Sequence, residues 1–314
     1  MTLLPLYYGL LALLVIGVAW WTLVARETMA AVIGFIAYGM LLGLVWAGIA
    51  SVDVALTEAA IGGGVTGVLL LRAAARLRPT EPAPHEKPGL VFRVLVGIFC
   101  AIVTIGLAVV VLFPTDPAPS LAIAAAEHLP ALELGNPVTA VLIAYRALDT
   151  MLEKVVLLLA LIGVWSLGPD RNWGGLPGRA PAVVTDSALT FLAKLLPPIG
   201  IVFGVYLLWT SADNPGGAFQ GGTVLAAMWI LAMMAGLRAP PAIGSRALRL
   251  LLLSGTITFI VVGFAGFLIA GGFLSYPAAF PKALILLIEI PMTLTIAVTL
   301  GLLVSGPAER DKTS

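Results

Sequence analysis

The chain has 314 residues, of which 60% are hydrophobic and only 11% are charged. Soluble domains contain about 25% charged residues, so this composition excludes a soluble globular fold and indicates an integral membrane protein. The net charge of +1, without a basic cluster, excludes nucleic-acid binding. Because the chain has one cysteine, Cys100, and two histidines, His85 and His128, we expect no intramolecular disulfide, metal site or cofactor.

Nine apolar segments are long enough to cross a bilayer as helices. A hydrocarbon core of about 30 Å requires about 20 apolar residues per helix, and lipid offers no partner for unpaired backbone groups. No segment shows the alternation of a barrel strand, so we predict an all-α polytopic membrane protein. We expect the first segment to be a retained span, because it has no basic leader and no cleavage pattern. The predicted helices are 3–25, 28–50, 52–73, 91–113, 137–168, 188–210, 218–238, 247–271 and 282–305.

Positive charge is distributed unequally over the connections between these segments. Alternate connections and the C-terminal tail contain Arg26, Arg72, Arg76, Arg78, Lys87, Arg93, Arg171, Arg179, Arg238, Arg246, Arg249, Arg310 and Lys312. The opposite connections contain only Lys282, and the long connection 114–136 is acidic, with Asp116, Glu127 and Glu133. Cytoplasmic loops retain Lys and Arg, so we predict an outside N-terminus and a cytoplasmic C-terminus in the inner (cytoplasmic) membrane.

Two turn-rich connections on the predicted cytoplasmic side divide the chain. Residues 76–89 hold four prolines and mixed charge, and residues 168–181 read GPDRNWGGLPGRAP. Such composition is typical of irregular structure between helices. It predicts blocks of three, two and four helices.

The third segment carries two acidic residues followed by a run of glycines. Asp53, at its outer end, either caps the helix or faces an ion path, and we expect the cap. Glu58 lies one to two turns deeper without a cation in the same helix, so we predict that it carries protons. The glycines are Gly62, Gly63, Gly64 and Gly67. Their GxxxG spacing favours close helix packing, and the run also permits a bulge that would gate Glu58.

The fifth segment contains a group of charges at helical spacing. Arg146, Asp149 and Glu153 share one face, and Lys154 follows on an adjacent face. Either these residues belong to a buried proton or cation path, or this half of an overlong helix lies at the solvated interface. Because apolar residues flank the charges on both sides, we predict the buried path and a bend before the apolar run 155–167.

The last block places two charges beside prolines. Lys194 precedes Pro197 and Pro198 and either belongs to the path or extends toward the cytoplasm. Glu289 precedes Pro291 about seven residues into an apolar run, so we predict that it is a functional carboxylate inside the membrane.

The connection 211–222, SADNPGGAFQGG, is rich in glycine. It lacks the lysine and hydroxyl of a phosphate-binding loop, so we predict a tight re-entrant turn in which Asp213 and Asn214 cap and Phe219 and Gln220 pack inward. The remaining residues assigned to this turn are Pro215, Gly216, Gly217, Gly221 and Gly222.

Three of these stretches resemble parts of a known assembly. VDVALTEAAIGGGVTGVLLLRA, 52–73, resembles the MbhD-like domain, and PVTAVLIAYRALDTMLEKVVLLLALIGVW, 137–165, resembles the MbhE-like domain. Both domains also form the end of the large MrpA subunit. DNPGGAFQGGTVLAA, 213–227, together with IEIP, 288–291, resembles MrpB. The family is the Mrp-type multisubunit Na+/H+ antiporter, which is related to the membrane arms of membrane-bound hydrogenases and complex I.

The resemblance implies a fused subunit that joins the MrpA tail to MrpB. It implies an MbhD-like domain at 1–78, an MbhE-like domain at 90–168 and an MrpB-like domain at 183–306. The implied partners are a separate MrpA/MrpD-like channel subunit, small MrpC-, MrpE-, MrpF- and MrpG-like subunits, Na+, H+ and the lipid bilayer. The implied function is monovalent cation/proton antiport, so we expect a secondary transporter subunit and not an enzyme. A redox-driven ion pump and a structural scaffold remain the alternatives.

Overall fold

A computed structural model describes residues 3–77, 89–113, 120–178 and 187–308. Within these ranges the regular structure is helical, and the single β-bridge is the isolated pair Pro177–Ala308. The elements are α1 Leu3–Val24, α2 Thr28–Gly48, α3 Val52–Glu58, η1 Ala59–Val65, α4 Thr66–Leu77, α5 Leu90–Leu112, α6 Ala122–His128, η3 Leu129–Leu132, α7 Pro137–Ala140, η4 Val141–Tyr145, α8 Ala147–Ser166, η5 Asp170–Asn172, α9 Ala188–Thr210, α10 Ala218–Met234, α11 Arg246–Ile269 and α12 Pro281–Ser305.

Seven helical segments in the described ranges are long and apolar enough to cross a membrane. They are Leu4–Val24, Thr28–Gly48, Val52–Leu77, Leu90–Leu112, Ala188–Thr210, Arg246–Ile269 and Pro281–Ser305. Two further predicted spans are helical but differ in character: α10 has only 17 residues, and α8 carries three charged side chains in its first half. The prediction of an all-α polytopic membrane protein is confirmed, whereas the count of nine spans stays a prediction.

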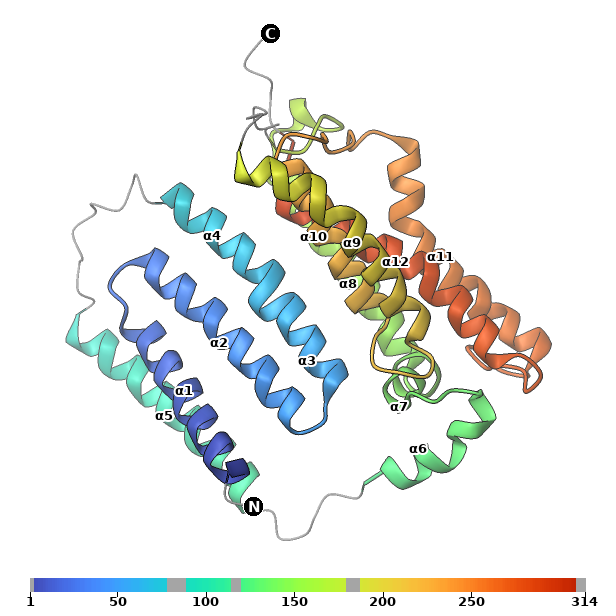
Figure 1. The fold of residues 1–314 in the computed structure, drawn as a ribbon, viewed down its shortest axis with the longest axis horizontal. Coiled ribbons are helices and arrows are strands. Elements are labelled where there is room, and N and C mark those ends of the chain that lie inside the picture. The colour runs from blue at the N-terminus through green and yellow to red at the C-terminus, as the bar shows by residue number, and fades with distance from the viewer. Residues whose placement is uncertain (1–2, 78–88, 114–119, 179–186, 309–314) are drawn as a thin grey trace.

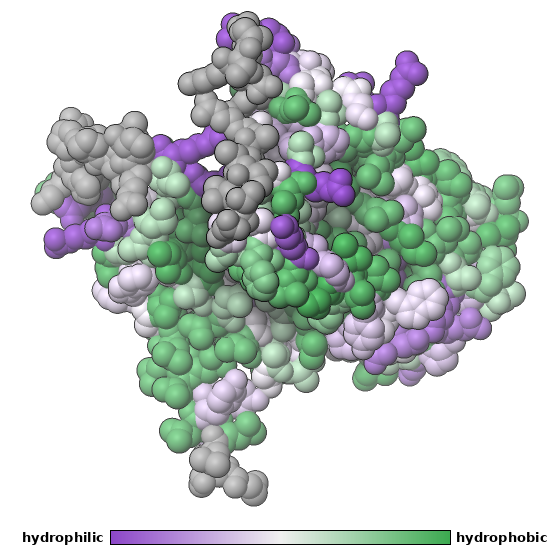
Figure 2. Space-filling view, turned by 45° about the horizontal axis from the view of Figure 1, so that its top comes forward, coloured by the Kyte–Doolittle hydropathy of each residue, from purple (hydrophilic) through white to green (hydrophobic). Residues whose placement is uncertain are grey.

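The orientation of the chain also stays a prediction. Several of the residues on which it depends, Arg78, Lys87, Asp116, Arg179, Arg310 and Lys312, lie outside the described residues, as does His85. Figure 2 shows that apolar side chains dominate the visible surface and that hydrophilic ones form a few separate groups on it. This distribution is that expected of a protein surrounded by lipid.

The helices form two groups (Figure 1). The N-terminal group consists of α1, α2 and the continuous helix α3–η1–α4, which pack in sequence order. The second group, here called the C-terminal bundle, contains α8 to α12, and α10 joins it to α3 and η1. In Figure 1, α5 lies toward the α1 edge, away from the C-terminal bundle. The connection 114–136, predicted to be a loop, contains the short helices α6 and η3.

Helix α12 lies at the centre of the C-terminal bundle. Ile285, Ile288 and Ile296 are fully buried along it, and Phe259 of α11 is fully buried against it. Lipid tails are as apolar as these side chains, so close van der Waals contact holds membrane helices together, and small residues permit it. Gly221 of α10 accordingly sits so close to α9 that a Cβ atom there would lie 2.6 Å from the Gly204 carbonyl oxygen.

The fifth predicted segment is divided into three pieces, but its break lies at Arg146, ahead of most of the charges, and not directly before the apolar run 155–167 as predicted. Asn136 caps α7 by accepting a 2.9 Å hydrogen bond from the Val138 amide. The chain then passes through the π-helix η4, and α8 begins after Arg146, whose φ of −128° and ψ of 35° interrupt the helix. Beyond this break, α8 packs against α11 and α12.

Candidate cavity between the N-terminal helices and the C-terminal bundle

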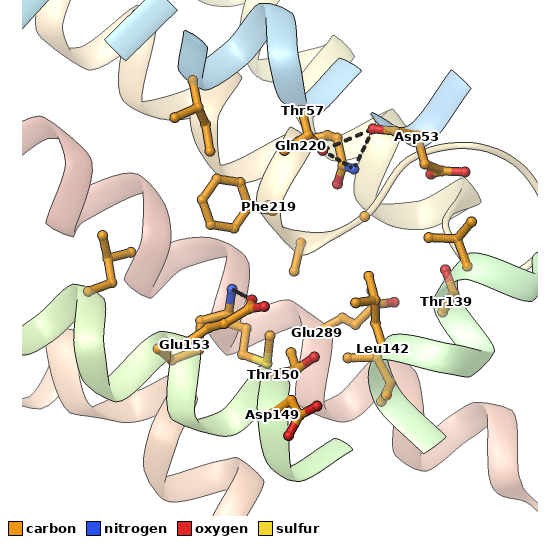
Figure 3. Close-up of a pocket in the computed structure, with 18 of the residues that line it drawn as sticks. Asp53, Thr57, Thr139, Leu142, Asp149, Thr150, Glu153, Phe219, Gln220 and Glu289 are labelled. Atoms are coloured by element: carbon orange, nitrogen blue, oxygen red, sulfur yellow. Dashed lines mark hydrogen bonds and ion pairs between the residues drawn. The ribbon is translucent and has the colours of Figure 1, made fainter. Parts of the chain in front are cut away.

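A cavity of about 900 Å³ lies where the N-terminal helices meet the C-terminal bundle. Its walls come from α3, from η4 and α8, from the turn before α10, and from α12 (Figure 3). Most lining side chains are apolar. The ionisable residues among them are Asp53, Asp149, Glu153, Lys154 and Glu289. Five ionisable residues from three of the predicted segments thus lie around one cavity.

Glu289 of α12 is 3% exposed and is fixed by two donors. The Ser211 hydroxyl donates a 2.6 Å hydrogen bond to its Oε2 atom. The backbone N–H of Ala218, the first residue of α10, also donates to this carboxylate. The positive end of the α10 helix dipole therefore points at the buried acid. Glu289 is thus buried inside the protein, and its predicted role as a functional carboxylate in the membrane stays a prediction.

Asp53 of α3 is 7% exposed and binds the same turn from the other side. Its Oδ1 accepts a 2.9 Å hydrogen bond from the Gly216 amide. The cap of α3 is Ser51, which makes no side-chain capping bond, so the prediction that Asp53 caps its own helix is wrong. Gln220 strengthens this contact by donating to the Thr57 hydroxyl at 3.0 Å and to the Asp53 carbonyl at 3.4 Å (Figure 3).

The glycine-rich turn is built to bring its amides to these acids. Gly216 and Gly217 have φ values of 153° and 151°, which favour glycine, and a Cβ atom on Gly216 would overlap the Leu207 carbonyl oxygen. The α10 cap is Gly217 without a side-chain bond, and Asp213 is exposed and pairs with Lys282 at 2.7 Å. The prediction that Asp213 and Asn214 cap is therefore wrong.

The other members of the turn lie as follows. Asn214 and Pro215 are exposed, and the carbonyl of Asn214 accepts a hydrogen bond from Asn136 Nδ2. Gln220 is buried and Phe219 half-buried, so the prediction that they pack inward is confirmed. Gly221 contacts α9, and a Cβ atom on Gly222 would lie 2.9 Å from Ile296 Cβ of α12.

The charges of α8 divide into buried and exposed groups. Lys154 is 5% exposed, with its ammonium 4.6 Å from the centre of the Phe219 ring and 3.8 Å from the nearest Glu153 oxygen. Arg146 pairs with Asp149, and the exposed fractions of the Arg146, Asp149 and Glu153 side chains are 72%, 51% and 58%. Within this chain the predicted burial of all four is wrong: only Lys154 is buried.

Two other predicted path residues do not line this cavity. Glu58 is half-buried and folds back along its own helix beside Gly62, and Lys194 is exposed on α9. Gly62, Gly63 and Gly64 belong to the π-helix η1, so the predicted bulge is present. The predicted close packing is present too, since Cβ atoms on Gly63 and Gly67 would meet Met40 Sδ and Ile36 Cγ1 of α2 at 2.8 Å and 2.7 Å.

Four hydroxyl groups of the site were not predicted. Thr57, Thr139 and Thr150 line the cavity, and Ser211 binds Glu289. Their signal in the sequence is spacing: Thr57 lies four residues after Asp53, and Thr150 lies four residues before Lys154, which places each on the face of a buried charge. Within the described ranges, no group of three His, Cys, Asp or Glu side chains could hold a metal ion.

The arrangement places a buried carboxylate, Glu289, and a buried ammonium, Lys154, on the walls of one cavity. Each side chain can bind or release a proton, and the hydroxyls and Gln220 offer hydrogen-bonding groups between α3, α8 and α12. Ionisable residues at this depth are costly and commonly mark proton or ion routes.

Comparison with known proteins gives two family matches in different parts of the chain. Residues 188–307 match the family described as a domain related to the MnhB subunit of Na+/H+ antiporter, and residues 13–79 match the MbhD family of MBH subunits. The chain is also 30% identical, over 193 residues, to an uncharacterized protein of Methanocaldococcus jannaschii. That alignment covers 54% of this chain and 72% of the relative.

Two solved structures share the fold. A chain in the structure of the Mrp complex from Dietzia sp. DQ12-45-1b superposes with a TM-score of 0.73 at 23% identity and covers 98% of this chain. This chain spans about a third, 35%, of that longer chain. A chain of the membrane-bound sulfane sulfur reductase, described as an archaeal respiratory membrane complex, superposes with a TM-score of 0.55 at 24% identity. It covers 69% of this chain, and 97% of its own length is matched.

Proposed function

Because this chain belongs to the family of MnhB- and MbhD-related subunits of Mrp-type antiporters, we propose that it is a membrane subunit of a multisubunit Na+/H+ antiporter. In this role it contributes the cavity between Asp53, Lys154 and Glu289 to the proton or cation path. The chain works as part of a secondary transporter in the cytoplasmic membrane and not as an enzyme.

The observation that carries this proposal is the burial of opposite charges on the walls of one membrane cavity. Glu289 and Lys154 are 3% and 5% exposed, although an ionisable side chain in the middle of a bilayer costs about 2.5 to 3.5 kcal/mol on insertion scales. If these positions served the fold alone, apolar side chains would occupy them at a lower cost in free energy.

We further propose that the chain is a fusion of three domains. The matches at 13–79 and 188–307 support an MbhD-like domain at 1–78 and an MrpB-like domain at 183–306. Residues 90–168 form the MbhE-like domain, which supplies Lys154. The separate partners are an MrpA/MrpD-like channel subunit and MrpC-, MrpE-, MrpF- and MrpG-like subunits.

A redox-driven pump is the second candidate function, because the fold is shared with a chain of a respiratory membrane complex. Identification of the subunits that co-purify separates the two candidates. Antiporter subunits alone support the antiporter, and iron–sulfur subunits support the pump.

The proposed role of Glu289 is tested with Glu289→Gln in the assembled complex, reconstituted in vesicles that report Na+/H+ exchange. Glutamine keeps the size and the hydrogen bond from Ser211 but cannot carry a proton, so we expect exchange to fall to background. The control is Glu127→Gln on the exposed face of α6. Normal exchange by Glu289→Gln in a fully assembled complex would leave the chain with a scaffold role.

A further inference from the structure

The glycine-rich turn before α10 is held by three helices at once. Its consecutive backbone amides, those of residues 216–218, donate in order to the Asp53 carboxylate of α3 at 2.9 Å, the Leu207 carbonyl of α9 at 3.1 Å and the Glu289 carboxylate of α12. One short stretch of backbone therefore joins two buried acids that belong to different groups of helices.

The turn fits too closely for one amide to move without the others. Gly216 and Gly217 have φ values of 153° and 151°, a region that residues with side chains rarely adopt. A Cβ atom on Gly217 would lie 2.7 Å from Oε1 of Gln220 and 4.0 Å from Oε1 of Glu289. Because planar peptide units leave only two soft dihedrals per residue, a displacement of the Gly216 amide is passed on to the Ala218 amide, two residues later.

On the α3 side, Asp53 is itself firmly placed. The residue is 7% exposed, and its backbone carbonyl accepts hydrogen bonds from the Thr57 hydroxyl at 2.9 Å and from Gln220 Nε2 at 3.4 Å. Gln220 Nε2 also donates to the Thr57 hydroxyl at 3.0 Å (Figure 3). These bonds fix the start of α10 to α3 at the point where the Asp53 carboxylate meets the turn.

We propose that Asp53 is a positioning residue for Glu289. By accepting the hydrogen bond of the Gly216 amide, the Asp53 side chain keeps the N–H of Ala218 directed at the Glu289 carboxylate. The proposal rests on the proposed function and deepens it, because it gives the two acids of the cavity different tasks. Glu289 carries the proton or cation, and Asp53 serves as a hydrogen-bond acceptor without exchanging a proton.

Two other roles for Asp53 lead to different expectations. A proton carrier needs a group that ionises, whereas a positioning residue needs only an acceptor oxygen. Asparagine has the shape of aspartate and an acceptor oxygen but does not exchange protons in this way, and alanine has no acceptor. A residue that only holds the fold would affect assembly, but not the hydrogen bonding of Glu289 in complexes that do assemble.

The first test measures Na+/H+ exchange per assembled complex in vesicles. A hydrogen bond to a charged group typically changes an equilibrium about tenfold or more, so we expect exchange by Asp53→Ala to fall about tenfold. Exchange by Asp53→Asn should stay within about twofold of wild type, because the acceptor is kept. Equal losses in the two variants would show that Asp53 carries protons, and normal exchange by Asp53→Ala would show that the bond is dispensable; either result overturns the proposal.

Two further variants complete this assay. Asp53→Leu keeps the branched shape of aspartate without an acceptor, and it replaces Asp53→Ala if that variant does not assemble. The control is Asp170→Ala, which removes an exposed aspartate of η5 that does not line the cavity and should leave exchange unchanged.

The second test observes Glu289 directly, by infrared difference spectroscopy of the purified complex on a change of pH. The carboxyl bands of Glu289 are those that Glu289→Gln removes. Because these bands depend on hydrogen bonding, we expect them to shift in Asp53→Ala and to stay in place in Asp53→Asn. Unshifted bands in Asp53→Ala would limit Asp53 to a role in the fold.

The infrared result does not depend on transport, so the two proposals fail separately. Normal exchange by Glu289→Gln, together with Glu289 bands that shift in Asp53→Ala, would refute the proposed function and leave the link between the two acids in place. Loss of exchange in Glu289→Gln, together with unshifted bands, would refute the positioning role alone.

Discussion

Helices α5 and α12 are similar in length but differ in surroundings. In an apolar stretch of 18 residues in α12, 56% of the residues are buried inside the protein, whereas none is buried in the corresponding stretch of α5. Helix α12 nevertheless contains the polar residues, with Glu289, Thr293, Thr295 and Thr299 all buried. The more uniformly apolar helix is the one that packs least.

This difference has a physical reason. In water, apolar residues drive a helix into the core, but lipid is as apolar as leucine and gives no such preference. Polar groups avoid lipid and therefore mark the side of a membrane helix that faces protein or water. Hydropathy thus identifies the spans of this chain, and the pattern of polar and small residues identifies which of them form the interior.

The largest effect on stability is expected from a comparison of two glycines, one at a contact between helices and one on α5. Gly221→Leu would drive a side chain into the Gly204 backbone, which cannot move without separating α9 from α10, so we expect a loss of at least about 3 kcal/mol and little folded protein. A Cβ atom on Gly97 of α5 would meet no atom within 4 Å, so Gly97→Leu should leave stability unchanged. Fluorescence-detected size exclusion after heating measures both, and equal behaviour of the two variants would refute the comparison.

A smaller effect is expected from a pair of phenylalanines. Phe259 of α11 is fully buried, and Phe259→Ala should destabilise the protein by about 2 kcal/mol, because a cavity remains although the transfer from water is absent in lipid. Phe99 of α5 is 67% exposed, so Phe99→Ala should change the free energy of unfolding, measured by thermal unfolding in detergent, by less than about 0.5 kcal/mol. A larger change for Phe99→Ala would indicate that α5 packs against protein.

The sequence predicted the all-helical membrane fold well and the site only in part. Helical spans and the burial of Glu289 follow from local composition, since a carboxylate deep within an apolar run must be covered. The partner of Asp53 could not be predicted, because its bond to the Gly216 amide joins residues 163 positions apart. The burial of Lys154 in place of Glu153 depends on the break at Arg146, which rotates α8 by an amount that helical spacing alone does not specify.

The smallest difference in stability is expected between variants of two tyrosines whose hydroxyls each donate to a backbone carbonyl. Tyr276, in the connection before α12, donates to the Ile143 carbonyl at 2.8 Å, and Tyr8 of α1 donates to the Gly48 carbonyl at 2.7 Å. Burial, helped by the charge of Glu289, raises the pKa of Tyr276, so its hydroxyl stays protonated at ordinary pH. Tyr276→Phe removes a half-buried hydrogen bond to a carbonyl of η4 and should cost about 1 kcal/mol, whereas Tyr8→Phe, at an exposed site, should cost only a few tenths of a kcal/mol.

The pH dependence sharpens the test of Tyr276. A raised pKa in the folded state means that the contribution is fully present below the unfolded value of about 10 and declines only above it. The difference in thermal stability between wild type and Tyr276→Phe should therefore be constant from about pH 6 to 9. A difference that disappears within this interval would show that Tyr276 ionises there, and that the connection before α12 is held to η4 by something other than this hydrogen bond.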